Sequence, residues 1–382
     1  MIKSFNVEVV PKVLIWLRNS SGWKIDEVAN RLGTSTEVVN ELELGKKNPT
    51  IKQLYILSEL YKVPIASFFL SNPKLEKPMP KDYRFLPNKT NIFEHKTLLV
   101  IRRTRTLQEL SKELSLNINY AMITEVKKVA LTDNPELIAL SYRKILNLDM
   151  QKQTKFKDAY KMFKYLRDVL ENLNIIVFQF SMPIEDARGF ALADESPNII
   201  VINSKDSIEA RLFTLMHEFG HIILKETVID IPEESLQVRN DIEAWCNTFS
   251  SAFLLPKEIS IDLFNKNNYD LTNTGTLNIL SKKYKVSKIF LLVKMIDLNY
   301  ISKQEFESVL ARYSKRETKV EKKKKNFIRV SADQKCLSQM GNKFVSLVAS
   351  NFDRELITYN DALSFLSIKS RNFDKVLSRA RK

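Results

Sequence analysis

Histidine and cysteine are both scarce in this chain. Its 382 residues include three histidines and two cysteines, Cys246 and Cys336. Two cysteines cannot build a dense disulfide framework, which excludes the class of small disulfide-stapled secreted domains. Long apolar runs are also lacking, since no stretch has the length of a membrane-spanning helix or the form of a secretory signal. We therefore expect a cytoplasmic protein without a membrane partner.

The charge of the chain is strongly positive and unevenly distributed. The formal net charge is +15 and the isoelectric point is about 9.5, which favours acidic partners such as nucleic acid. Residues 301–382 hold nineteen Lys/Arg and nine Asp/Glu, and therefore supply +10 of this charge. The densest part, residues 315–325, is typical of a solvated linker, and the alternative is a nucleic-acid contact.

Two of the three histidines stand four residues apart in the sequence His-Glu-Phe-Gly-His at 217–221. On a helix, this spacing puts both imidazoles on one face, where they can ligate one Zn²⁺. Glu218 follows the first histidine and can reach a metal-bound water. Gly220 is unfavourable inside a helix but is explained if another backbone or a substrate passes close to it. The alternative is a pair of core histidines satisfied by hydrogen bonds.

The segment around this motif predicts a buried helix. Asp206 is a suitable N-cap with Glu209 three residues later, and apolar residues then cover most sides of the helix. Unpaired polar groups cost several kcal/mol in an apolar interior. Two histidines and a glutamate on a buried helix therefore need a reason, and metal ligation provides one.

A catalytic zinc site needs a third protein ligand and an open position. The following segment, 242–255, has the apolar spacing of a helix, and it carries Glu243 and Asn247 one turn apart. We predict Glu243 as the third ligand and Asn247 as a supporting or packing residue. The alternative is that Glu243 is a solvated carboxylate like the neighbouring Asp241. We interpret Cys246 as a small buried hydrophobic residue.

Residues 188–256 resemble the ImmA/IrrE metallopeptidase family. In that family the glutamate four residues before the asparagine ligates zinc, which favours Glu243 as a ligand. The resemblance implies a zincin-like core in which His217, His221 and Glu243 hold Zn²⁺, with Mn²⁺ as the alternative metal, and Glu218 is the catalytic base. The residues that carry the resemblance are Arg188-Gly189-Phe190, the strand 198–203, the run 213–221, and Ile242-Glu243 through Asn247, Phe249 and Leu254-Leu255-Pro256.

The N-terminal segment predicts four short helices at 10–19, 25–32, 35–44 and 51–61, separated by glycine-containing turns. This segment resembles the Cro/repressor-type helix-turn-helix domains, through Gly22-Trp23, Asp26-Glu27-Val28-Ala29, Leu32-Gly33, Glu43-Leu44-Gly45 and Pro49-Thr50.

The charge of the predicted reading helix complicates DNA binding. Residues 35–44 carry Glu37, Glu41 and Glu43 and no basic residue, so the helix would approach phosphates with the wrong charge. Lys46 and Lys47 remain candidate phosphate contacts. A module that binds a protein partner is therefore the alternative to a direct DNA reader.

These features predict a zinc-dependent endopeptidase that cleaves a specific regulatory protein. The resemblance favours a transcription repressor as the substrate, because better understood family members inactivate repressors. Residues 199–203 and 175–180 read as strands, and an edge strand above the metal would hold an extended substrate. The alternative function is a DNA-binding regulator or antitoxin-like protein with a non-catalytic peptidase domain.

The predicted architecture is α+β, with a small sheet in the peptidase core and helices elsewhere. Six segments are expected along the chain: a helix-turn-helix domain at 1–70, a proline-rich linker at 71–91, a helical region at 92–172, the metallopeptidase core with its following helices at 173–313, a basic linker at 314–326 and a small helical unit at 327–382.

Overall fold

A computed structural model describes residues 5–73, 93–120, 122–127, 129–224, 236–265, 273–320 and 331–380. Most of the predicted linker at 71–91 and residues 321–326 of the predicted basic linker lie outside these ranges. Residues 314–320, which were also predicted as part of the basic linker, instead continue a helix that ends at Val320. The chain divides into two compact units: residues 1–80, 85–106 and 185–187 form the first, and residues 81–84, 107–184 and 188–382 form the second. Among the described residues, no helix has the length and apolar character needed to cross a membrane.

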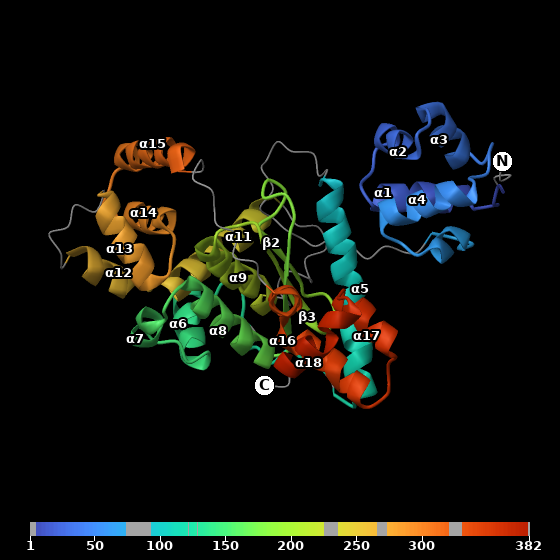
Figure 1. The fold of residues 1–382 in the computed structure, drawn as a ribbon. Helices are drawn as coiled ribbons and strands as arrows, with labels where there is room; N and C mark the ends of the chain where they lie inside the picture. The colour runs from blue at the N-terminus through green and yellow to red at the C-terminus, as the bar shows by residue number, and fades with distance from the viewer. Residues whose placement is uncertain are drawn as a thin grey trace. The chain divides into compact units, whose positions relative to one another are not determined.

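The first unit contains the predicted helix-turn-helix domain. Its elements are α1 (Pro11–Ser20), α2 (Ile25–Leu32), α3 (Thr36–Glu43), α4 (Ile51–Tyr61) and the 3₁₀ turn η1 (Ile65–Phe69). These bounds confirm the four helices expected from the sequence (Figure 1). Glycine 33 ends α2 with φ of 64° and ψ of 40°, a left-handed conformation that glycine adopts without strain.

Arg102 connects the beginning of the next helix, α5 (His95–Asn117), to the helix-turn-helix domain. Its guanidinium donates to Ser21 Oγ at 2.8 Å and to the carbonyl oxygen of Tyr61. His95 stacks on Trp23 with ring centroids 4.3 Å apart. Local periodicity in the sequence cannot show which residues of a helix meet a distant partner.

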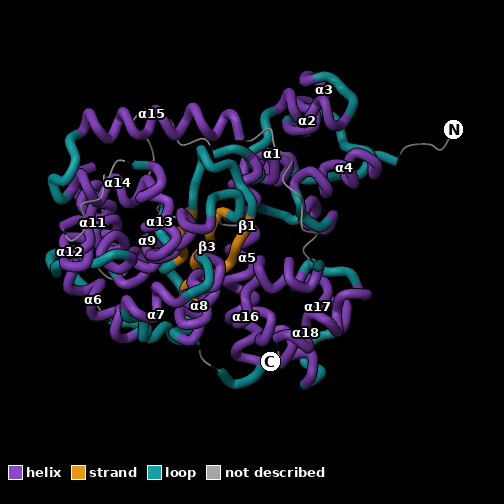
Figure 2. The backbone as a smooth tube through the Cα atoms, turned by 60° about the vertical axis from the view of Figure 1, so that its left-hand side comes forward, coloured by secondary structure: helices purple, strands orange, loops and turns teal. Residues whose placement is uncertain are grey.

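The second unit is built around a three-stranded sheet. Its strands are β1 (Ile175–Phe180), β2 (Gly189–Leu192) and β3 (Asn198–Asn203). The spatial order is β1-β3-β2, with β3 parallel to β1 and antiparallel to β2. Every residue of β1 and β3 is buried, as expected when both faces of a sheet are covered. Figure 2 shows the strands enclosed by helices.

The sheet order identifies the edge strands, which the sequence left unassigned. The run 199–203 forms β3, which is the central strand and has both edges occupied. The short β2, which the sequence showed only as part of the Arg188-Gly189-Phe190 match, forms the edge next to the motif helix. Strand order could not be derived from periodicity because it depends on long-range pairing.

The remaining elements of the second unit are helices, which confirms the α+β class. Helices α6 (Pro135–Ile145), α7 (Met150–Lys155) and α8 (Ala159–Asn172) precede the sheet, as predicted for residues 92–172. After it come α9 (Ile208–Ile223), α11 (Leu236–Leu254), α12 (Lys257–Asn265), α13 (Thr274–Tyr284), α14 (Lys288–Asp297), α15 (Lys303–Val320), α16 (Ala332–Asp353), α17 (Tyr359–Leu366), η2 (Ser370–Asn372) and α18 (Phe373–Ala380).

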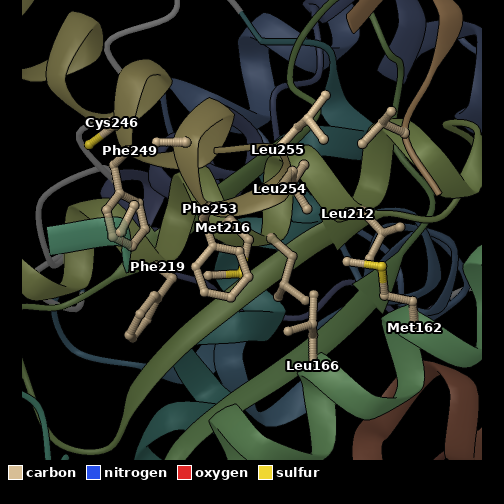
Figure 3. Packing of buried hydrophobic residues seen from close by; sticks show 14 of the residues in the cluster. Met162, Leu166, Leu212, Met216, Phe219, Cys246, Phe249, Phe253, Leu254 and Leu255 are labelled. Carbon is tan, nitrogen blue, oxygen red and sulfur yellow. The ribbon is translucent and has the colours of Figure 1, made fainter. Parts of the chain in front are cut away.

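The main core lies where α9 packs between α8, α11 and the sheet. Figure 3 shows its large side chains, among them Phe219 and Met216 from α9, Phe249 from α11, and Leu166 from α8. All four are completely buried. Burial of side chains of this size contributes roughly 1.5–3 kcal/mol each, so this core holds the two helices that bear the motif and the predicted third ligand.

A buried ion pair fastens the C-terminal helices to the sheet. Arg167 and Glu171 of α8 pair at 3.0 Å with almost no exposure. Arg167 donates to the carbonyl oxygens of Val177 and of Ser338 in α16, and Glu171 accepts from the backbone N–H of Lys343. Burial lowers the pKa of Arg167 and raises that of Glu171, so each charge depends on these partners.

Gly341 kinks α16 where its backbone meets the Arg167–Glu171 pair. Its φ of 80° and ψ of 160° are not helical. A β-carbon at position 341 would lie 2.7 Å from Nη2 of Arg167 and even closer to Oε1 of Glu171. Only glycine satisfies both the backbone conformation and the available space.

We predict that Gly341→Ala destabilises the second unit by about 3 kcal/mol or more, because it combines backbone strain with a clash against a buried ion pair. Calorimetry should show the melting temperature of this unit falling by roughly 6–10 °C. Gly275→Ala in the first turn of α13 is the matched control, since alanine there meets only the side chain of Asn273. Equal melting temperatures for both variants would contradict the role of the kink.

Candidate metal centre

Helix α9 begins one residue later than the sequence predicted. Ser207 is the N-cap, and its Oγ accepts from the backbone N–H of Ala210 at 3.2 Å. Asp206, the predicted cap, instead pairs with Arg188 at 2.8 Å. Both residue types are good caps, and the long-range ion pair with Arg188 decided between them. The helix is buried along most of its length, as predicted.

The close approach predicted at Gly220 is made by α11. A β-carbon at position 220 would lie 3.1 Å from Sγ and 3.5 Å from Cα of Cys246. Glycine therefore lets the two helix backbones cross at short distance. Cys246 itself is completely buried and has a free thiol, which agrees with its interpretation as a small core residue.

This crossing brings the predicted ligands together. The Nε2 atoms of His217 and His221 are 3.1 Å apart. Glu243 directs Oε2 to Nε2 of His217 at 3.2 Å and Oε1 to Nε2 of His221 at 3.3 Å. Among the described residues, these three are the one His/Cys/Asp/Glu group whose donor atoms converge closely enough for a metal ion.

The spacing of these donors fits a zinc ion. Ligands in a tetrahedral zinc site lie at roughly 2.0–2.2 Å from the metal and therefore about 3.3 Å from one another. The observed separations of 3.1, 3.2 and 3.3 Å match that value. Two imidazoles and one carboxylate leave one tetrahedral position open, as in catalytic zinc sites.

The electrostatics of the cluster keep Glu243 ionised. Burial works to raise the pKa of Glu243, but the two imidazoles outweigh it and lower the pKa below its usual range. Burial also works to lower the pKa of His221, and contacts with Cys246, Glu243 and Glu218 outweigh it and raise this pKa.

Glu218 points to the side of α9 that faces β2. It is buried, and a β-carbon at position 189 would lie 3.3 Å from its Oε1, 2.6 Å from Cγ2 of Thr214 and 2.8 Å from the carbonyl oxygen of Val201. Gly189 therefore leaves room for the Glu218 carboxylate. In the sequence, the feature that could have indicated this contact is a glycine at the start of a strand. Such a glycine often marks a place where another group lies close to the backbone.

A cavity of about 920 Å³ lies beside α9 and α11 in the second unit, and none of His217, Glu218, His221 and Glu243 lines it. Its wall includes Phe213 and Thr214, one turn before His217, and Asn247, one turn after Glu243. Asn247 is exposed on this wall instead of packing in the core. Lys294 of α14 also lines the cavity, where burial lowers its pKa and Nζ donates to Ser251 Oγ at 3.1 Å.

The candidate DNA contacts belong to the first unit. Lys46 and Lys47 are exposed in the turn after α3, and both backbone N–H groups bond to the carbonyl oxygen of Glu41. The structure also revises the charge of the reading helix. Glu43 is buried and accepts from Arg18 at 2.6 and 2.9 Å, so its negative charge is neutralised and only Glu37 and Glu41 stay exposed.

Comparison with known proteins agrees with this arrangement. A family model described as "IrrE N-terminal-like domain", a peptidase family, matches residues 170–295, and a helix-turn-helix model matches residues 14–68. The radiation response metalloprotease IrrE of Deinococcus radiodurans is 33% identical over 78 residues, which cover 19% of this chain. The match spans 24% of that relative's length. The chain thus joins a helix-turn-helix domain of the XRE type to a domain that matches the IrrE-like peptidase family.

Proposed function

We propose that this chain is a zinc-dependent endopeptidase that cleaves a specific regulatory protein. The observation that carries the proposal is the convergence of His217, His221 and Glu243 at the spacing of zinc ligands, with Glu218 beside them. We place the substrate in the cavity lined by Phe213, Thr214 and Asn247, which lie about one turn from the ligands. A structural zinc site would instead be closed by a fourth protein ligand.

His217, His221 and Glu243 would hold the ion, for which Mn²⁺ is the alternative to Zn²⁺. When bound, the metal supplies a polarised peptide carbonyl and a water of lowered pKa. Glu218 accepts the proton of the attacking water on its carboxylate and then donates it to the leaving amine. Burial keeps Glu218 out of bulk solvent, and Gly189 leaves the space in which the carboxylate lies.

The edge strand β2 and the cavity are suited to a peptide substrate. Within the described sheet, β2 pairs only with β3, so its outer edge can bond to an extended backbone. The cavity wall is largely apolar, with Phe213, Leu254 and Phe290. We infer that the backbone pairs with β2 and that one apolar side chain enters the cavity.

The N-terminal domain supports a regulatory substrate. A helix-turn-helix domain in the same chain would bring the peptidase to DNA or to a DNA-bound partner, and the family resemblance favours a transcription repressor as the protein cleaved. The exposed acids of α3, Glu37 and Glu41, favour recruitment by a partner over reading of bases. Exposed Lys46 and Lys47 are the candidate phosphate contacts of this domain.

Metal binding tests the ligand set directly. We expect the purified wild-type chain to hold one zinc, and His217→Ala and Glu243→Ala to lose it, because two remaining ligands bind too weakly. Asp241→Ala is the matched control, since Asp241 is an exposed acid two residues from Glu243. Elemental analysis after gel filtration gives the stoichiometry. Retention of zinc by Glu243→Ala would rule out Glu243 as a ligand.

Proteolysis is tested in cells by mapping new protein N-termini. The wild-type chain should generate a small set of them, and Glu218→Gln should reduce their rate of appearance by about 10²–10⁴-fold while keeping its zinc, because only the proton acceptor is lost. If the zinc-loaded wild type and Glu218→Gln give the same termini, the peptidase proposal fails. The alternative, a DNA-binding regulator or antitoxin-like protein with a non-catalytic domain, would then hold.

Gly189 provides a separate test of how Glu218 is positioned. We expect Gly189→Ala to keep its zinc and to cleave the substrate about 10–100-fold more slowly, because the new methyl group meets Thr214 and the carbonyl oxygen of Val201, so that β2 shifts against the Glu218 carboxylate. Cleavage is followed with the substrate found in the N-terminal mapping, and Gly275→Ala is the remote glycine control. Unchanged cleavage by Gly189→Ala would show that Glu218 does not act from this position.

A further inference from the structure

The C-terminal helices α17 and α18 repeat the backbone plan of the helix-turn-helix in the first unit. There, α2 has eight residues, Gly33 is left-handed, and the extended Ser35 caps α3 with φ of −88° and ψ of 163°. In the second unit, α17 also has eight residues and ends at Ser367, which is left-handed with φ of 52° and ψ of 45°. Lys369 is then extended, with φ of −85° and ψ of 151°.

The second helix follows at the same point in both plans. Helix α3 starts directly after Ser35, and the short turn η2 followed by α18 starts directly after Lys369. The buried positions correspond as well. In both cases, buried side chains lie five residues before the left-handed residue and six and nine residues after it. Relative to Gly33 they are Val28, Val39 and Leu42. Relative to Ser367 they are Ala362, Phe373 and Val376.

A third helix completes the C-terminal unit. Helix α16 packs against both α17 and α18. Cys336 and Asp333 make contacts to them before the kink at Gly341, and Phe352 makes contacts after it. Phe352 of α16 contacts Phe373 edge to face at 5.0 Å, and Tyr359 of α17 contacts the same ring at 4.7 Å. A bundle of three short helices that fixes the angle of a helix-turn-helix pair is the usual framework of such DNA-binding units.

The exposed face of the second helix is basic, which is the opposite of α3. Residues 367–379 contain four basic residues and the single acid Asp374, for a net charge of +3. The four basic residues are all exposed, and Arg379 also pairs with Asp333 at 2.7 Å; they are Lys369, Arg371, Lys375 and Arg379. By contrast, α3 presents exposed Glu37 and Glu41.

We propose that α17 and α18 form a second helix-turn-helix that binds duplex DNA and that α18 enters the major groove. Lys369 caps η2, Arg371 lies in η2 and Lys375 lies in the first turn of α18. The start of the second helix is the part that contacts base edges and phosphates in such units. The chain would then hold DNA through its C-terminal unit, while its N-terminal domain is free for another partner. This assignment is independent of the proposed peptidase activity.

The test measures the affinity of the full-length zinc-loaded chain for a labelled random-sequence DNA duplex of about 30 base pairs, by fluorescence anisotropy from about 50 to 200 mM salt. We expect Lys369→Glu/Arg371→Glu/Lys375→Glu to weaken binding at least about tenfold and to flatten the salt dependence by about two to three units of slope, because each phosphate contact contributes about 0.9. Running the series in the Glu218→Gln background keeps the result separate from any proteolysis.

Two variants serve as controls. Lys155→Glu/Lys157→Glu/Lys161→Glu changes the net charge equally at three exposed lysines of the same unit, and it should keep most of the affinity. Lys46→Glu/Lys47→Glu should weaken DNA binding less than the triple variant Lys369→Glu/Arg371→Glu/Lys375→Glu does. Circular dichroism and melting temperature establish that each variant is folded, and an α18 variant that fails to fold is replaced by the corresponding alanine triple.

The outcomes that would overturn the proposal are distinct. They are no binding of the duplex by the wild type at low salt, equal loss of affinity in the Lys155/Lys157/Lys161 control, and loss of affinity in the Lys46/Lys47 variant alone. Stronger competition by duplex or single-stranded RNA than by duplex DNA would assign the basic face to RNA and would also overturn it.

Discussion

The contact of α9 with α11 across Gly220 is the interaction on which the metal centre depends. Because residue 220 has no side chain, Cys246 can approach the α9 backbone closely. Glu243 lies about one turn before Cys246 on α11 and is thereby brought to both imidazoles. The aromatic core around the crossing, with Phe219 and Phe249, holds this geometry. The burial that stabilises the unit therefore also orients the donors.

A second constraint joins the C-terminal helices to the same unit. The Arg167–Glu171 pair is buried and each member also bonds to the backbone of α16. Removing one member of such a pair leaves an uncompensated charge, which is more costly than the pair itself is worth. The kink at Gly341 lets the α16 backbone meet the Arg167–Glu171 pair. Helix α16 forms the basic three-helix unit together with α17 and α18. DNA contact and proteolysis would then reside in one compact body.

The two helix-turn-helix plans differ in what their second helices present. In the first unit, Arg18 neutralises Glu43 in the interior, and burial opposes the guanidinium charge less than this contact favours it, so the pKa of Arg18 is raised. Glu37 and Glu41 remain on the exposed face of α3, while Lys369, Arg371, Lys375 and Arg379 are exposed in and before η2 and α18. Phosphate contacts dominate affinity for DNA. Two units with the same backbone plan but opposite exposed charges are therefore expected to bind different partners.

Features that depend on near neighbours in the chain could be predicted from the sequence. The four N-terminal helices, the motif helix and its buried character follow from apolar spacing, capping residues and glycine turns. The two histidines share a face because helix geometry places residues four apart on one side. Glu243 could be proposed from the next helix, although an exposed carboxylate was an equally consistent interpretation until the resemblance favoured ligation.

Features that depend on contacts between distant segments required the tertiary structure. Periodicity shows that 198–203 is a strand, but pairing with β1 and β2 makes it central. Ser207 replaces Asp206 as the cap because Arg188 attracts the aspartate. The place of Glu218 against Gly189, the cavity beside α9 and α11 and the pairing of Glu43 with Arg18 are likewise long-range. The sequence by itself determined which helices form and which residues can bind a metal, since these follow from local geometry. Only the tertiary structure decided how these residues converge, because the packing energy that fixes it comes from residues far apart in the chain.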